Sequence, residues 1–305
     1  MPSSMWTTFW RKGRNPKRAL AAQNNGANRE GTEATRKCPP ASLGCTVAIG
    51  HSHLIALVEA QKARIRQGQE LTTHLHTILL QDEELQPNVI PDGRRTALSP
   101  ALRRRLDNEL AALPQTPPFL CASIGGNEHF LVGLTEHPQP YDFSLPGRPD
   151  LAVRSGVQII APSLMRKTLE RSMADTTLSL AIMTALREAT DIPIVFLQSP
   201  PPVSSSDFIR NNPGPFQRAM EENGIAPASL RMKLWLLQSS IYRQHCEELG
   251  CRYLEVPEEA VDGSGFLQEI GSWHDSIHAS PWYAELVLKQ IDMALQQSPA
   301  AEVSR

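Results

Sequence analysis

From Cys45 onward, short apolar runs alternate with long amphipathic stretches, and this alternation constrains the fold more than any other feature of the sequence. The runs have the length of buried strands, and the stretches between them carry apolar residues at helical spacing. Parallel strands need crossover connections, which are usually helices. The sequence therefore predicts a parallel sheet with helices on both faces. The predicted strands are residues 45–49, 84–90, 119–124, 192–198 and 251–256.

The spacing of apolar residues also predicts where the helices lie. Ser99 is a typical helix cap, and Pro100 suits the first helical position that follows it. Ser280 and Pro281 mark the start of the last helix in the same way. The other predicted helices are residues 53–67, 162–189 and 227–249.

The two ends of the chain differ from this pattern. Residues 1–44 are basic, rich in Asn, Gly and Thr, and without an apolar period, so we predict a disordered leader. Residues 45–297 form the predicted α/β domain, and residues 298–305 a flexible tail. The start of the chain does not have the pattern of a secretory signal, and no segment is long and apolar enough to predict a membrane span.

Composition excludes some classes of partner. The formal net charge of −2 and the sequence pI of about 6.5 give no reason to expect nucleic acid or an anionic membrane as a partner. The five cysteines are scattered, which predicts neither a disulfide framework nor a zinc ribbon and favours a cytoplasmic setting. No feature predicts a cofactor, and the oligomeric state is left open.

In a parallel sheet, ligands bind beyond the carboxyl ends of the strands, so residues that directly follow strands are candidates for a site. The stretch "VAIGHSHLIAL" places Ser52 after the first strand and before a helix. Gly50 permits a tight turn there, and the free N–H groups of the helix end favour an oxyanion. A serine at this position is more often a helix cap than a nucleophile.

Two later segments carry polar groups at comparable positions. "SIGGNEH" follows the third predicted strand, and its Asn127 side chain is a donor suited to an oxyanion, while Gly126 lets backbone approach a substrate. "WHDSIHAS" precedes the last helix, and its Asp275 and His278 are three residues apart. This spacing lets the carboxylate accept the imidazole N–H and leaves the other ring nitrogen for a nucleophile.

The order of these segments resembles the SGNH hydrolases, also called GDSL-type esterases. The resemblance covers the organisation of roughly residues 45–297 and the residues of the motifs themselves. It implies a flavodoxin-like three-layer α/β/α fold with a five-stranded parallel sheet. It also implies a catalytic triad of Ser52, Asp275 and His278 with Asn127 as an oxyanion donor. The expected substrate is an ester of a small molecule or a glycan, and the acyl group passes to water or to another alcohol.

The resemblance is weaker at three positions. The glycine of the second motif falls on Gly93, with Gly68 as a rival. His51 stands where the family usually has Asp, which removes an acceptor that would shape the turn. Glu128 replaces an Asp in the third motif.

Two other classes of protein remain open. One is a metal-binding protein, because His51 and His53 form one H-x-H pair and His74 and His76 another. We predict no metal site, since a two-residue spacing on a helix, where we place the second pair, turns side chains to different faces. The other class is a catalytically silent relative that binds a glycan or an acyl chain.

Residues 129–156 form a long connection rich in proline and glycine that begins beside Asn127. Its length predicts either a functional lid, which we favour, or a disordered insert. Tyr141 and Phe143 are aromatic, and we expect them to line the substrate pocket and to stack against a sugar or an acyl chain. The alternative is that they only hold the connection against the domain.

Overall fold

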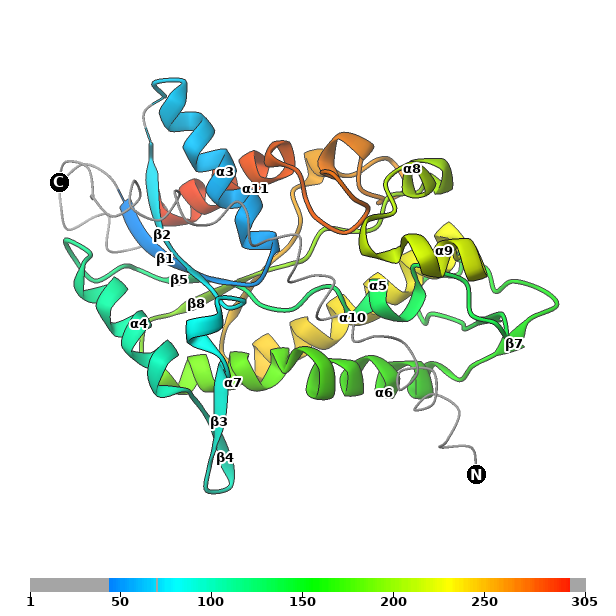
Figure 1. The fold of residues 1–305 in the computed structure, drawn as a ribbon, viewed down its shortest axis with the longest axis horizontal. Coiled ribbons are helices and arrows are strands. Elements are labelled where there is room, and N and C mark those ends of the chain that lie inside the picture. The colour runs from blue at the N-terminus through cyan, green and yellow to red at the C-terminus, as the bar shows by residue number, and fades with distance from the viewer. Residues whose placement is uncertain (1–43, 70, 297–305) are drawn as a thin grey trace.

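A computed structural model gives the structure of the chain and describes residues 44–69 and 71–296. Five parallel strands form its main sheet in the order β2-β1-β5-β8-β9 (Figure 1). In order along the chain this is 2-1-3-4-5, the flavodoxin-like arrangement. The predicted fold class is therefore confirmed. The strands are β1 (Gly44–Gly50), β2 (Thr73–Leu79), β5 (Leu120–Ser123), β8 (Ile194–Leu197) and β9 (Arg252–Leu254).

Helices cover the two faces of the sheet and complete three layers (Figure 1). The faces separate because successive side chains of a strand point in opposite directions. Val47 and Ile49 of β1 pack in the core cluster on one side, and Ala48 packs in the cluster on the other. The first side holds α4 (Pro100–Ala111), α6 (Pro162–Ser172), α7 (Ser179–Ala189) and α10 (Ala228–Leu249), and the second holds α3 (His53–Arg66) and α11 (Pro281–Gln296).

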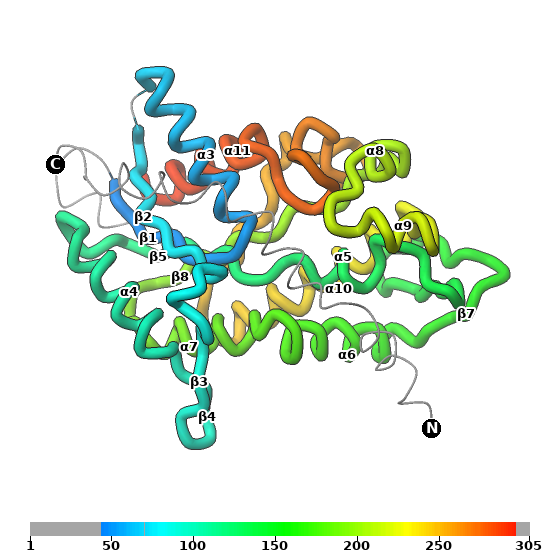
Figure 2. Tube along the Cα trace, viewed as in Figure 1, coloured from blue at the N-terminus to red at the C-terminus, as the bar shows by residue number. Residues whose placement is uncertain are grey.

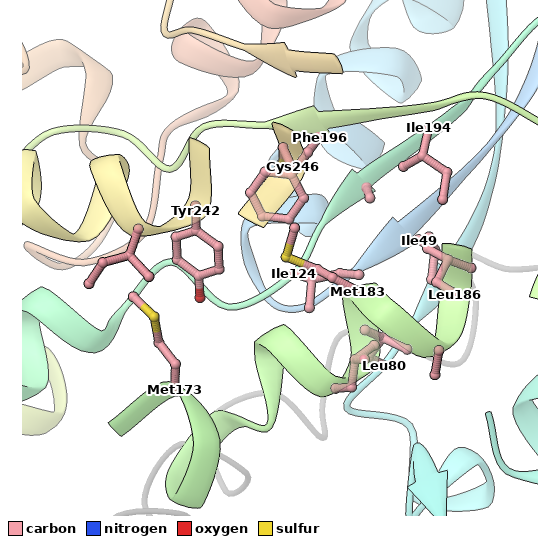
Figure 3. Close-up of a cluster of buried hydrophobic side chains, with 14 of the residues drawn as sticks. Ile49, Leu80, Ile124, Met173, Met183, Leu186, Ile194, Phe196, Tyr242 and Cys246 are labelled. Atoms are coloured by element: carbon pink, nitrogen blue, oxygen red, sulfur yellow. The ribbon is translucent and has the colours of Figure 1, made fainter. Parts of the chain in front are cut away.

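The core on the first side joins residues that lie far apart in the sequence (Figure 3). Tyr242 and Cys246 of α10 lie with Met183 of α7 and Phe196 of β8. The rings of Phe196 and Tyr242 are stacked, with centroids 5.2 Å apart. Burial of this apolar area fixes α7 and α10 against the sheet and stabilises the fold by about 25 cal/mol per Å².

The second strand of the sheet is not the predicted one. Residues 84–90 form part of a 3-10 helix and of a separate antiparallel hairpin, whereas the strand beside β1 is β2. His74 and His76 therefore lie on a strand and not on a helix. β2 lacks a continuous apolar run because Thr and His alternate with apolar residues, and one of these side chains, His76, bonds to Glu109. The hairpin consists of β3 (Val89–Asp92) and β4 (Arg95–Leu98), preceded by η1 (Glu83–Leu85).

The long helix predicted over residues 162–189 is interrupted. A π-helical turn, η2 (Met173–Thr177), follows α6, and Leu178 then takes a left-handed conformation with φ of 53°. A new helix, α7, starts at Ser179. In contrast, the predicted start at Ser99 is confirmed, since the Ser99 hydroxyl accepts the N–H of Leu102.

The remaining elements lie mostly in the connections between the strands of the sheet. Figure 2 follows the chain from β8 through α8 and α9 into α10, a connection to which the sequence analysis assigned no helix. The predicted leader and tail lie outside the described residues, except for Gly44, with which β1 begins. The elements are α5 (Glu128–Gly133), β6 (Tyr141–Asp142), β7 (Gln158–Ile159), α8 (Ser206–Asn211), η3 (Gly214–Phe216), α9 (Gln217–Asn223), η4 (Glu258–Ala260) and η5 (Glu269–Gly271).

Tyr141 and Phe143 do not line a pocket. Their exposed fractions are 3% and 0%, and both belong to the core cluster on the α10 side of the sheet. Between them, Asp142 makes a buried ion pair of 2.5 Å with Lys233 of α10. The expectation that these aromatic side chains contact a substrate is therefore wrong, because the connection is held down by core packing and by this ion pair.

Candidate active site

The strand order reverses beside β1. The chain runs from β1 through α3 to β2, which pairs with one edge of β1. β5 pairs with the other edge of β1. The loops after β1 and β5 therefore diverge at the switch point where ligands of such sheets bind. Gly50 and Ser123 are register partners at the carboxyl ends of these strands. Ser52 and Asn127 follow them at this edge.

The turn after β1 needs both of the residues that precede Ser52. A Cβ atom on Gly50 would lie 2.2 Å from the Ser123 carbonyl oxygen, so no larger residue fits there. The His51 N–H donates to that same oxygen at 2.9 Å. Its Nδ1 accepts the N–H of Gly125 at 3.0 Å. The expectation that His51, in place of Asp, removes a hydrogen-bond acceptor from the turn is therefore wrong, because the imidazole Nδ1 is itself an acceptor.

Ser52 occupies the cap position of α3, but its side chain makes no capping hydrogen bond. Its backbone is already helical, with φ of −56° and ψ of −27°, whereas a capping serine is usually extended. The structure records no acceptor for the Ser52 N–H within residues 44–69 and 71–296. The Ser52 hydroxyl is therefore not committed to capping α3.

Asp275 and His278 are in contact, as their spacing predicted. The His278 Nδ1 lies 2.8 Å from Asp275 Oδ2. The other carboxylate oxygen, Oδ1, accepts the backbone N–H groups of Ile277 and His278 at 2.9 and 2.8 Å. His278 Nε2 is buried and has no hydrogen-bond partner among the described residues. The carboxylate thus orients the ring and leaves Nε2 as the nitrogen that can accept a proton.

A turn from another part of the chain covers the Asp275 carboxylate. A Cβ atom on Gly214 would lie 2.8 Å from Asp275 Cβ, and Gly214 has a φ of +52°. Two donors of Ser276, the N–H and the hydroxyl, bond to the Asn212 carbonyl oxygen at 3.1 and 2.8 Å. The segment after α8 therefore holds the Asp275–His278 turn in place.

His53 connects the three candidate segments. It directly follows Ser52, and its Nε2 lies 2.7 Å from Asn127 Oδ1. The centroids of the His53 and His278 rings are 6.0 Å apart. One buried side chain thus reaches both the asparagine after β5 and the histidine before α11. The sequence shows His53 only as half of an H-x-H pair, because nothing local indicates a contact with a residue 74 positions away.

Glu128 fixes the loop that carries Asn127. Its side chain is fully buried, and Oε1 accepts the hydroxyl groups of Tyr242 at 2.9 Å and Thr177 at 2.7 Å. Its Oε2 accepts the N–H of Gly126 at 3.0 Å. Burial and the nearby Glu128 charge raise the pKa of Tyr242 well above its usual value, so the phenol stays a donor. The extra methylene of Glu, compared with Asp, lets the carboxylate reach α10.

The two predicted glycines, Gly126 and Gly93, lie in different surroundings. The Gly126 N–H is taken by Glu128 and Tyr242, and its carbonyl oxygen accepts the Gln238 side chain at 2.9 Å, so it offers no oxyanion donor. Gly93 forms the turn of the β3–β4 hairpin, which projects away from the body of the molecule (Figure 1). It is exposed there, and its rival Gly68 follows the far end of α3.

Gln81 is a polar residue at this edge that the sequence analysis missed. It follows β2, and the preceding Leu80 N–H donates to the Gly50 carbonyl oxygen at 2.8 Å. Both amide atoms of Gln81 are buried and have no hydrogen-bond partner among the described residues. Buried polar atoms of this kind are uncommon in folded proteins and mark Gln81 as a candidate contact for a ligand.

Burial keeps the histidines around the site neutral. It lowers the pKa of both His51 and His53 to about 4, and for His53 the His278 charge acts in the same direction. Burial also lowers the pKa of His129 to about 3. Burial alone raises the pKa of Asp275, but the hydrogen bonds and charge of His278 outweigh it and lower this pKa to about 2. A neutral His51 remains an acceptor, and an ionised Asp275 remains able to stabilise a charged His278.

We expect the chain to lose stability as the pH falls from 6.5 toward 5. The unfolded chain takes up protons on His51, His53 and His129 near pH 6.5, whereas the folded chain takes them up only near pH 4 or below. The stability that these three neutral histidines contribute is therefore fully present above pH 6.5 and is lost as the pH falls below it. With three such groups, the free energy of unfolding should fall by about 3 kcal/mol as the pH falls from 6 to 5.

Urea unfolding at a series of pH values measures this slope. Replacing His129 with Gln removes one of the three groups and should lower the slope by about a third. A free energy of unfolding that stays constant between pH 7 and pH 5 would contradict this account.

Within the described part of the chain, no group of three or more His, Cys, Asp or Glu side chains could hold a metal ion. The ring centroids of His74 and His76 lie 5.3 Å apart on β2. Glu109 Oε2 lies within hydrogen-bond distance of His76 Nδ1, at 3.1 Å. Cys121, Cys246 and Cys251 are free thiols. None of the described helices is both long and apolar enough to cross a membrane.

Comparisons with known proteins give matches among solved structures. No protein-family model and no curated protein matches this sequence. A GDSL-like lipase from Bacteroides thetaiotaomicron is 13% identical, with 93% of this chain and 98% of that chain covered and a TM-score of 0.39. The periplasmic domain of a lipopolysaccharide acetyltransferase from Salmonella ser. Paratyphi A is 13% identical, with 100% and 98% covered and a TM-score of 0.37.

A phospholipase A1 from Streptomyces albidoflavus is 10% identical, with 82% of this chain and 99% of that chain covered and a TM-score of 0.36.

Proposed function

We propose that this chain is a serine esterase of the SGNH type that cleaves or transfers an acyl group through an acyl-enzyme. The observation that carries the proposal is the Asp275–His278 pair, whose free ring nitrogen is buried beside the helix that Ser52 begins. A serine, an imidazole and a carboxylate in this order form the standard machinery of acyl transfer.

The proposed reaction starts when His278 Nε2 takes the proton of the Ser52 hydroxyl. Ser52 Oγ attacks the carbonyl carbon of the ester, and the charge that develops on the carbonyl oxygen is stabilised by the Ser52 N–H and the Asn127 amide. The tetrahedral intermediate then breaks its bond to the alcohol, which leaves with the proton from His278. Asp275 stabilises the imidazolium between these two proton transfers.

The second half of the reaction repeats these steps with a new acceptor. Water, or the hydroxyl group of another molecule, loses its proton to His278 and attacks the acyl carbon. Ser52 leaves and recovers its proton, so the product is an acid or a new ester. The choice between these acceptors decides whether the protein is a hydrolase or a transferase.

The proposed substrate is an acyl ester. The expectation of a carbohydrate ester depended on Tyr141 and Phe143 as stacking surfaces, and both are buried in the core. A silent binding protein would also have the fold, but it would have no need of an ionised Asp275 beside a buried ring nitrogen of His278.

A serine-reactive fluorophosphonate tests the proposal. The folded chain should gain one phosphonyl group, and peptide mass spectrometry should locate it on Ser52, because only a serine beside a base is activated for attack. The same chain unfolded in guanidinium is the matched control and should remain unlabelled. A label on any other serine, or no label on the folded chain, would contradict the proposed function.

A further inference from the structure

The bond between His53 and Asn127 determines which way the asparagine amide faces. Asn127 Oδ1 lies 2.7 Å from His53 Nε2, and an amide oxygen can only accept a hydrogen bond. The hydrogen must therefore be on His53 Nε2. Since the amide is planar, fixing its oxygen on His53 also fixes the direction of the Nδ2 group.

The described residues supply no second restraint on this amide. Asn127 occupies the cap position of α5, but its side chain makes no capping hydrogen bond. The bond to His53 is the one that the structure records for this side chain within residues 44–69 and 71–296. Without His53, rotation about the last side-chain bond would let the oxygen and the NH₂ group exchange places. An oxygen aimed at an oxyanion would repel it.

The His53 ring is held in place by packing. It is buried, with an exposed fraction of 7%. A Cβ atom on Gly126 would lie 3.7 Å from His53 Cδ2, so the ring lies against the backbone that leads to Asn127. The same ring is 6.0 Å from the His278 ring, measured between centroids. His53 therefore ties the loop after β5 to the side of the site that holds the proposed base.

The environment of His53 favours a single ring hydrogen. Burial and the His278 charge lower its pKa to about 4, while the hydrogen bond to Asn127 and the Asp275 charge act against this shift. The other ring nitrogen, Nδ1, is buried and has no partner among the described residues. A second hydrogen there would find no acceptor, so the neutral ring with hydrogen on Nε2 is the stable form.

We propose that His53 is a positioning residue that holds the Asn127 oxygen and thereby aims the amide NH₂ group at the oxyanion of the acyl-transfer reaction. This inference rests on the proposed function. His53 acts through Asn127 and touches no reacting atom, since its Nε2 is committed to the amide. His278, which is paired with a carboxylate, is the residue that moves protons.

Two substitutions of His53 separate this role from simple packing. His53→Leu removes the donor, and we expect kcat to fall by about tenfold to a hundredfold with KM within about twofold, as for partial loss of an oxyanion donor. His53→Gln places an amide Nε2 the same number of bonds from Cβ as the ring Nε2. It should keep kcat within about threefold of wild type. A Gln variant that folds but is as impaired as the Leu variant would overturn the proposal.

A double-mutant cycle tests whether His53 acts through Asn127. Once Asn127→Ala has removed the amide, His53→Leu should lower kcat by less than about twofold more. If His53→Leu costs the same factor in both backgrounds, the two residues act independently and the proposal is wrong.

The wild-type chain provides a measurement that does not depend on any variant folding. Long-range ¹⁵N–¹H NMR spectra of histidine-labelled protein at pH 7 should show His53 neutral, with its hydrogen on Nε2. Hydrogen on Nδ1 would overturn the proposal. Failure of the proposed function gives a different result, because the fluorophosphonate then leaves Ser52 unlabelled whatever the state of His53.

Discussion

Replacing Ser52 with alanine should lower kcat for a p-nitrophenyl ester by about 10⁵-fold to 10⁶-fold, since the nucleophile of a triad cannot be replaced by its neighbours. The free energy of unfolding should change little, because the Ser52 hydroxyl makes no capping hydrogen bond that alanine would lose. Steady-state rates with esters of short and long acyl chains, together with thermal unfolding, measure both effects.

Ser264→Ala is a suitable control for this substitution. Ser264 is exposed and lies in the loop after η4. Its variant should retain wild-type rates. Equal ester hydrolysis by the wild type and by folded Ser52→Ala would mean that Ser52 is not the nucleophile, and the triad assignment would then be abandoned.

Asp275→Asn should lower kcat/KM by about 10⁴-fold while the chain stays folded. Asp275 Oδ1 accepts two backbone N–H groups, so the remaining oxygen of an asparagine would occupy this position. The new NH₂ group would then face His278 Nδ1 in place of Oδ2. Facing a donor, Nδ1 would lose its hydrogen, and Nε2 would carry one and could no longer accept the Ser52 proton.

The pH dependence and a second aspartate check this explanation. The loss should persist across the pH range in which the wild type is active, because it reflects the wrong ring tautomer and not a shifted titration. Asp262→Asn is the matched control, since Asp262 Oδ1 also accepts two backbone N–H groups but lies in an exposed turn. A loss of less than about tenfold in Asp275→Asn would show that Asp275 is not part of the proton-transfer system.

Local sequence patterns predicted most of the sheet and failed where tertiary contacts replace them. β1, β5, β8 and β9 agree with predicted runs to within two residues at each end. The first three were predictable because buried parallel strands are apolar on both faces. β2 was missed because "THLHTIL" mixes polar side chains with apolar ones, so it has no continuous apolar run. The Leu75 N–H bonds to Gln61 at 2.8 Å, and His76 bonds to Glu109. Residues 84–90 looked like a strand since a short apolar segment fits either a sheet or a separate hairpin.

The aromatic residues of the 129–156 connection illustrate the same limit. A sequence shows that Tyr141 and Phe143 are costly to expose, but it does not show whether a substrate or the core covers them. The partner is Lys233 of α10, which is buried against Asp142 between them. A lysine within an amphipathic helix carries no sign that it will meet a carboxylate 91 positions earlier.

For the candidate site, the sequence alone was sufficient to predict what depends on neighbours in the chain. Three-residue spacing brings Asp275 to His278, and a glycine before Ser52 makes the tight turn after β1. Other features depend on the strand order, which sets β1 beside β5 and so brings His53 to Asn127 across 74 positions. The acceptor role of His51 and the occupied N–H of Gly126 also came only from the structure. A hydrogen bond between distant residues requires that both backbones are already in place, and no local pattern encodes that condition.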